Sequence, residues 1–137
     1  MSVIVTEDGF GADTWSGGFA TLEELEGRSA LDLNVSDDPN ELEGRLDDLA
    51  IIRVSFPSNA DGRGFSQGQV LRHLGYTGRL RAVGPLMSDQ FPMALAAGFD
   101  EVEIPDDLAA RQPEHHWLTA LSRYVGLSYQ SRLRQSA

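Results

Sequence analysis

The stretch AIIRVSFPSNADGRGFSQGQVLRHLGYTGRLRAVG, residues 50–84, decides the fold class of this chain. It opens with a mostly apolar run of strand length, residues 50–56. A predicted helix over residues 66–73 follows and ends at Gly75, and residues 80–83 form the next predicted strand. A strand–helix–strand unit of this length predicts two parallel strands joined by a right-handed crossover.

The same alternation continues in both directions along the chain. We expect further strands at residues 3–6, 31–35 and 101–104, and further helices near residues 39–49, 88–97 and 113–125. Four such units favour an α/β fold, a single-domain three-layer sandwich with a mostly parallel sheet of four or five strands. An incomplete piece of a barrel is the alternative, but it would leave exposed edges and an empty interior.

The domain organisation follows from this pattern. We expect one domain over residues 1–137, with βα repeats over residues 31–126. Residues 1–30 form a less regular N-terminal extension packed on those repeats. The start of the chain has neither a basic flank nor a long apolar run, so no signal peptide is expected. A cytoplasmic location is therefore the expectation.

Composition excludes several kinds of chemistry. The chain has 137 residues and no cysteine, which excludes disulfides, thiol nucleophiles and cysteine-ligated clusters. No apolar run is long enough for a transmembrane helix. We expect no metal site, because His115 and His116 are neighbours on a predicted helix and point in different directions. We also expect no bound cofactor, because no dinucleotide-binding or P-loop motif is present.

The charge is strongly negative and unevenly distributed. The net charge is −10, and residues 1–50 alone hold 13 acidic residues against two arginines. No basic stripe is present, so we expect binding to neither nucleic acid nor anionic membranes. The acidic half is either a solvated surface or a docking surface for a basic partner protein.

Polar residues follow the predicted strands, at the edge where ligands bind in parallel sheets. The longest such loop, residues 58–66, contains glycines that permit unusual backbone geometry and Ser66, which could cap the next helix. If adjacent strands carry these loops, the residues in them should converge. The candidate anion-binding residues are Asp61, Gly62, Arg63, Gly64, Ser66, Arg81, Asp89 and Gln90. The alternative is that Asp61 and Arg63 pair only to brace the loop.

A run of short motifs resembles the bacterial domain of unknown function 934 family, best over residues 50–104. The motifs are Asp61-Gly62-Arg63-Gly64-Phe65-Ser66-Gln67, Leu71-Arg72, Gly75-Tyr76-Thr77-Gly78, Leu80-Arg81-Ala82-Val83-Gly84, Ser88-Asp89-Gln90 and Gly98-Phe99-Asp100, with a weaker echo at Ser128-Tyr129-Gln130. The resemblance implies a protein described as an oxidoreductase associated with assimilatory sulfite reduction, with no established catalytic residues. Ser88 stands where many members have arginine, and Ala94 to Gly98 lack the arginine and cysteine often found there.

Two functions from different classes are compatible with the sequence. The first is a non-catalytic accessory protein that docks to sulfite reductase or its electron donor. The second is a small enzyme or oxyanion sensor in which Arg63 binds the anion and Asp61 or Asp89 handles protons. Side chains alone supply no reversible electron store, which favours the accessory function.

Overall fold

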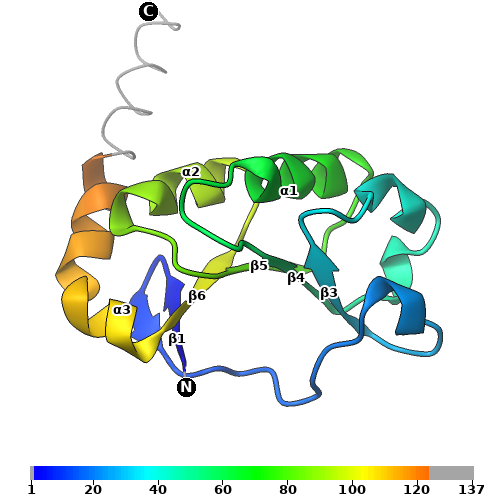
Figure 1. Cartoon of the computed structure of the whole chain (residues 1–137), viewed down its shortest axis with the longest axis horizontal. Coiled ribbons are helices and arrows are strands. Elements are labelled where there is room, and N and C mark those ends of the chain that lie inside the picture. The colour runs from blue at the N-terminus through cyan, green and yellow to red at the C-terminus, as the bar shows by residue number, and fades with distance from the viewer. Residues whose placement is uncertain (1, 124–137) are drawn as a thin grey trace, which may run out of the picture.

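A six-stranded sheet runs through the middle of the molecule (Figure 1), whose computed structural model describes residues 2–123. The strands are β1 (Ser2–Thr6), β2 (Gly9–Gly11), β3 (Ala30–Asn34), β4 (Ile51–Ser55), β5 (Arg79–Val83) and β6 (Glu101–Pro105). Their order is β2-β1-β6-β5-β4-β3. The four strands from β3 to β6 are parallel, whereas β1 is antiparallel to both of its neighbours. The mixed α/β class with a mostly parallel sheet is confirmed, with six strands in place of four or five.

The helices differ in extent from those expected. They are α1 (Arg63–His73), α2 (Phe91–Ala96) and α3 (Asp106–Arg111), and residues 114–123 are also helical. Helix α1 begins three residues earlier than expected, and α2 is shorter. Single 3-10 turns lie at η1 (Leu22–Glu24), η2 (Pro39–Leu42), η3 (Leu46–Asp48) and η4 (Ser88–Gln90). The helix expected near residues 39–49 is wrong, because Gly44 adopts φ 82° between η2 and η3 and interrupts it. The expected end of the last helix and the Ser128-Tyr129-Gln130 motif lie outside the described residues.

One face of the sheet carries the apolar core. Because β3 to β6 lie in consecutive order, crossovers of one hand place α1 and α2 on the same face, as Figure 1 shows. The strand residues on that face alternate with those on the other face and are buried. They include Leu31, Leu33, Ile52, Val54, Leu80, Ala82, Val102 and Ile104. At the β1 end of the sheet, Trp117 closes the core against Phe91, with ring centroids 5.8 Å apart.

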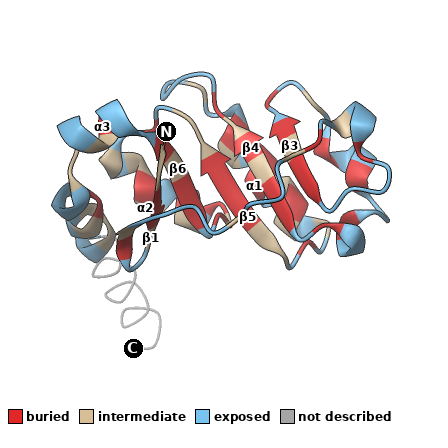
Figure 2. Cartoon of the chain, turned by 90° about the horizontal axis from the view of Figure 1, so that it is seen from below, coloured by how far each residue is buried: buried red, intermediate tan, exposed pale blue. Residues whose placement is uncertain are grey.

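An extended segment covers the second face, the side of the sheet opposite α1 and α2. We call residues 12–19 the strap; they contain no helix or strand and run beneath the sheet from β2 toward β3. Figure 2, viewed from that side, shows the mostly exposed strap crossing the buried strands. After the strap, Ala20 forms a parallel bridge with Leu31 on the outer edge of β3. The third layer of the molecule is therefore this strap rather than a second layer of helices.

A membrane-spanning helix must be both long and apolar. None of the helices between residues 2 and 123 combines the length and the apolar character needed to cross a bilayer.

Candidate functional site

The strand-end loop after β4 holds the pair predicted from the sequence. Arg63 donates through Nη2 to Asp61 at 2.6 Å and through Nε at 3.0 Å. The backbone N–H of Arg63 also donates to the same carboxylate at 3.1 Å. These hydrogen bonds lower the pKa of Asp61 to about 2. The Arg63 side chain remains 61% exposed, so the pair is a surface brace with one edge of the guanidinium open to solvent.

The neighbouring residues of this loop have other roles than expected. Gly62 has an ordinary φ of −79° and open space around it. Gly64 lies inside α1, where any Cβ would overlap the ring of Phe56. Ser66 is an exposed residue within α1, because the helix begins at Arg63; the expectation that Ser66 caps the helix is wrong.

The loop after β5 meets the loop after β4, although not through the residue expected. Gln90 donates from Nε2 to the carbonyl of Asn59 at 2.7 Å and accepts from the Met87 N–H at 2.8 Å. Asp89 is exposed and forms no ion pair with Arg63. The two loops therefore lie together, joined by Gln90. Anion binding at this edge remains a prediction.

Arg81 lies on the second face, away from α1 and the loop that precedes it. Its side chain is fully buried and donates to Glu101 at 2.6 Å, to Glu103 at 2.9 Å and to Asp13 at 2.9 and 3.1 Å. Burial alone would lower the pKa of Arg81, but the hydrogen bonds to these carboxylates outweigh it and raise the pKa. The structure does not bring Arg81 together with Asp61 and Arg63.

A charged row crosses the second face at the level of Arg81. Asp32, Arg53, Arg81 and Glu101 are register partners on β3, β4, β5 and β6. Arg53 donates to Asp32 at 3.1 Å and lies 3.7 Å from Glu103. Such a row is unusual, because both faces of a parallel sheet are normally apolar. We use "charged row" below for these four residues.

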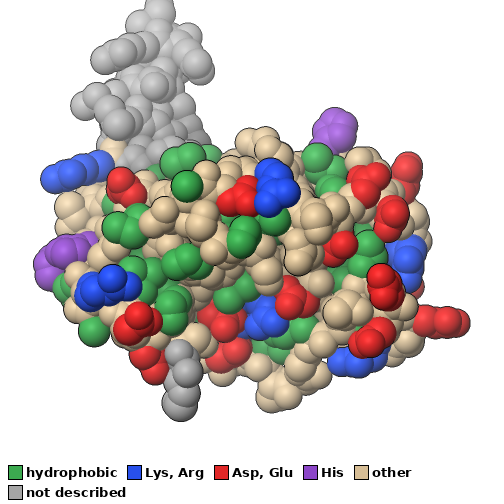
Figure 3. All heavy atoms as spheres, viewed as in Figure 1, with side chains coloured by type: hydrophobic (Ala, Val, Ile, Leu, Met, Phe, Trp, Pro, Cys, Tyr) green, Lys and Arg blue, Asp and Glu red, His purple; other side chains and the backbone are tan. Residues whose placement is uncertain are grey.

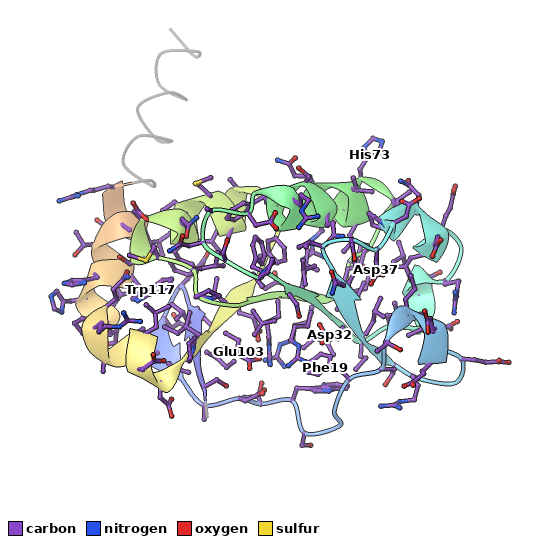
Figure 4. All side chains as sticks on the ribbon, in the orientation of Figure 1. Phe19, Asp32, Asp37, His73, Glu103 and Trp117 are labelled. Atoms are coloured by element: carbon purple, nitrogen blue, oxygen red, sulfur yellow. The ribbon has the colours of Figure 1, made fainter. Side chains whose placement is uncertain are left out.

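The strap supplies the outer contacts of the charged row. Asp13 binds Arg81, and the ring of Phe19 lies 4.1 Å from the guanidinium carbon of Arg53. Figure 4 shows Phe19, Asp32 and Glu103 between the sheet and the strap. The hydrogen bond from Arg81 lowers the pKa of Asp13. Sequence reasoning missed this network, because Asp13 and Arg81 are 68 residues apart. The alternation of charged residues in β5 and β6 was the available signal.

A surface cavity near α1 offers less chemistry. It measures about 520 Å³ and lies between the β1–β2 turn and the C-terminal end of α1. Arg72 lines it, but its guanidinium already donates to the carbonyls of Gly98, Tyr76 and Gly78 and to Asp100, at 2.8 to 3.0 Å. Arg72 therefore has a structural role: its hydrogen bonds join α1 to two loops.

The histidines form no metal site within residues 2–123. His73 projects from α1 into solvent (Figure 4), and His115 and His116 are exposed. No group of three or more His, Cys, Asp or Glu side chains in this part of the chain is arranged to hold a metal ion.

A group of exposed carboxylates forms an acidic end of the molecule, around η1, η2 and η3 beside β3. Its exposed carboxylates gather there in Figure 3, and none has an ion-pair partner among the described residues. Arg28 and Arg45 are the basic residues of this region. The acidic end consists of Glu23, Glu24, Glu26, Glu41, Glu43, Asp47 and Asp48.

Comparison with known proteins identifies the family. The family described as bacterial protein of unknown function (DUF934) matches residues 30–137, which include β3 to β6 and the whole charged row. No curated protein and no solved structure matches the chain. The matched segment covers most of the sequence, so the chain belongs to the DUF934 family of bacterial proteins.

Proposed function

We propose that this protein is a non-catalytic accessory protein that docks to a basic surface of a larger partner through its acidic end. The observation that supports the proposal is a group of seven exposed carboxylates on η1, η2, η3 and the turns beside them, which form no ion pair within residues 2–123. Together with Arg28 and Arg45 they give this end a net charge of −5. Such a surface attracts a complementary partner over several ångströms and speeds association.

The carboxylates of the acidic end are close together and have no ion-pair partner within residues 2–123. Repulsion among like charges on neighbouring turns destabilises the folded state slightly. A structural role would be expected to pair some of them with arginine, as the molecule does for Asp32, Asp61 and Glu101. Clustering without pairing fits a surface that meets positive charge from another protein.

Assimilatory sulfite reductase or its electron donor is the partner that we propose. The support for it is the resemblance of the motif run at residues 61–100 to a family associated with sulfite reduction. The proposal assigns the electron transfer to the partner's cofactors, because the side chains of this chain store no electrons.

A charge-reversal experiment tests the proposal. The quadruple variant Glu41→Lys, Glu43→Lys, Asp47→Lys, Asp48→Lys is compared with wild type for binding to purified sulfite reductase and to its electron donor. We expect at least about a tenfold rise in Kd at low salt, and wild-type binding that weakens as salt shortens the Debye length below about 10 Å.

The matched control places four reversals elsewhere on the surface. Glu7, Asp89, Asp106 and Asp107 are exposed and belong to other elements. Their reversal to lysine gives the same net charge and should leave Kd within about twofold of wild type. Equal loss of binding in the two variants, or no binding by wild type to either partner, would refute the proposal.

A second candidate function, oxyanion binding at the strand-end loop, is favoured by one observation. The Nη1 group of Arg63 donates to no described residue, and the side chain is largely exposed. Calorimetric titration of sulfite into wild type and Arg63→Ala tests it. Binding by wild type that Arg63→Ala abolishes would support the anion site; equal heats would leave Arg63 as a brace alone.

A further inference from the structure

On the second face of the sheet, the guanidinium of Arg81 binds a carboxylate through two nitrogens; we call this guanidinium edge the Arg81 fork. Within the sheet, Arg81 donates Nε to Glu101 at 2.6 Å and Nη1 to Glu103 at 2.9 Å. Its outer edge donates two hydrogen bonds to Asp13, from Nη1 at 3.1 Å and from Nη2 at 2.9 Å. This two-point geometry is the most selective way in which arginine recognises a carboxylate. Asp13 is thus a ligand that the strap brings to the sheet from outside.

A place for an aromatic ring lies beside the fork. The ring of Phe19 stacks 4.1 Å from the guanidinium carbon of Arg53 and 5.9 Å from that of Arg81. The buried Nε of Arg53 has no hydrogen-bond partner among the described residues, so the ring covers an incompletely paired cation. The face therefore binds two side chains of the strap, the carboxylate of Asp13 and the ring of Phe19, which are six positions apart in the sequence.

Two side chains hold the strap on the charged row. Its contacts with the row come from Asp13 and Phe19, while Ala12, Thr14 and residues 16–18 are exposed. The indole N–H of Trp15 donates to the carbonyl of Gly18, which also belongs to the strap, at 2.8 Å. A segment with few buried contacts and no regular backbone pairing opens at low free-energy cost.

The sheet residues that form this face and the strap belong to different parts of the chain. The family match begins at residue 30 and includes all four residues of the charged row. The strap precedes it. The charges remaining without the strap balance, because Arg53, Arg79 and Arg81 face Asp32, Glu101 and Glu103. An incoming carboxylate would therefore reproduce the charge state that Asp13 creates.

We propose that the charged row is a docking surface for an extended segment of a partner protein, which carries a carboxylate and an aromatic ring about six residues apart, and that the strap occupies this surface in cis as a competitor. The carboxylate of the partner takes the Arg81 fork, and its ring covers Arg53. This surface is separate from the acidic end, and the proposal does not depend on the function proposed above.

The test uses the full chain and a synthetic peptide of the strap sequence, GADTWSGGFA, residues 11–20. The double variant Asp13→Asn, Phe19→Ala removes both contacts of the cis strap with the row and changes no residue of the sheet. In amide NMR titrations we expect the peptide to bind this variant at least about tenfold more tightly than wild type, because a tethered competitor acts at an effective concentration in the millimolar range. The shifted amides should lie on β4, β5 and β6.

Two controls sharpen the result. The variant Thr14→Ala, Ser16→Ala changes exposed strap residues that form no hydrogen bond to the row, and should bind the peptide as wild type does. The same peptide carrying Asp13→Asn and Phe19→Ala should bind the double variant at least about tenfold more weakly than the unchanged peptide does. If the double variant fails to fold, Phe19→Ala alone carries the same comparison.

Three outcomes would overturn the proposal. The first is equal affinity of the peptide for wild type and the strap variant. The second is the absence of shifts on β4 and β5 at millimolar peptide. The third is a dimer in light scattering that dissociates when Asp13 and Phe19 are replaced, which would assign the surface to the strap of a second copy.

Discussion

Two glycines in the turn into α1 differ in what they require. Gly64 contacts the ring of Phe56 so closely that a Cβ has no room, whereas Gly62 faces open space. We expect Gly64→Ala to destabilise the protein by about 1 to 3 kcal/mol through overpacking, despite the better helix propensity of alanine. Gly62→Ala is the matched control and should change stability by less than about 0.5 kcal/mol. Urea unfolding monitored by circular dichroism measures both; equal values would contradict the packing argument.

Tyr76 is a buried phenol whose hydroxyl donates to the carbonyl of Arg79 at 3.0 Å. Burial raises the pKa of Tyr76 from 10.0 to about 12. Because the folded state favours the neutral phenol, this contribution to stability is complete below pH 10 and is lost as the pH rises toward 12.

Ultraviolet absorbance titration of the folded protein tests the assignment of this phenol. We expect a tyrosinate component near pH 12 that is missing from Tyr76→Phe. The substitution should also cost about 1 to 2 kcal/mol at neutral pH, because it removes the hydrogen bond from the Tyr76 hydroxyl to the Arg79 carbonyl. A folded variant that keeps the component near pH 12 would show that another phenol causes it.

The residues of the candidate site were predictable only in part. Asp61 and Arg63 are two positions apart, so their pairing follows from the sequence alone. Arg81 joins them among the predicted site residues as a polar position of the motif run that resembles the family. Its side chain points to the second face. There it pairs with Asp13, which comes from a segment with no periodic hydrophobic pattern. Local spacing carries no information about such a contact.

At the scale of the elements, strands were more predictable than helices. All four parallel strands fall within two residues of the expected positions, because runs such as Ile51–Ser55 are short and rich in branched apolar residues. The region of residues 39–49 has leucines at helical spacing, and Leu42, Leu46 and Leu49 are indeed buried. Gly44 nevertheless divides it into two 3-10 turns. Periodicity identified the buried face there but not the backbone.

The strap is the element whose stability should depend most directly on one titratable group. The Arg81 hydrogen bond holds the pKa of Asp13 below its ordinary 3.8, with burial opposing it and Arg79 adding a favourable charge. The strap is therefore fully stabilised above about pH 3.8, and the stabilisation is lost as the pH falls through the lowered pKa.

The indole N–H signal of Trp15 reports this transition in NMR, because the indole binds within the strap. We expect its chemical shift to move toward that of a solvent-exposed indole on acidification of wild type. In Asp13→Asn it should already lie near that value at neutral pH. An acid transition of the same size in Asp13→Asn would assign the titration to another group.

At the scale of the whole molecule, strand order limits where a ligand can bind. Crevices in open parallel sheets form where the strand order reverses and neighbouring loops diverge to opposite faces. The parallel strands here run β6-β5-β4-β3 without reversal, so the loops after β4 and β5 turn the same way and Gln90 ties them together. The sequence predicted that these loops would meet. It could not predict that they would turn the same way rather than diverge around a crevice, because local hydrophobic periodicity does not determine the order of the strands in the sheet.

Net charge acts on the whole molecule too, and its effect on stability is separable from docking. At −10, the folded chain repels itself, most strongly at the acidic end. Raising the sodium chloride concentration should therefore raise the melting temperature of wild type by a few degrees, as screening lengths fall from about 30 Å at 0.01 M to about 8 Å at 0.15 M.

The two quadruple lysine variants described above resolve the origin of this effect, since both change the net charge from −10 to −2. If the repulsion is concentrated at the acidic end, reversal of Glu41, Glu43, Asp47 and Asp48 should remove more than half of the salt dependence. Reversal of Glu7, Asp89, Asp106 and Asp107 should remove less, because these carboxylates are dispersed over other elements. Calorimetry over a salt series measures both. An equal loss in the two variants would mean that total charge, rather than its clustering beside β3, governs the stability.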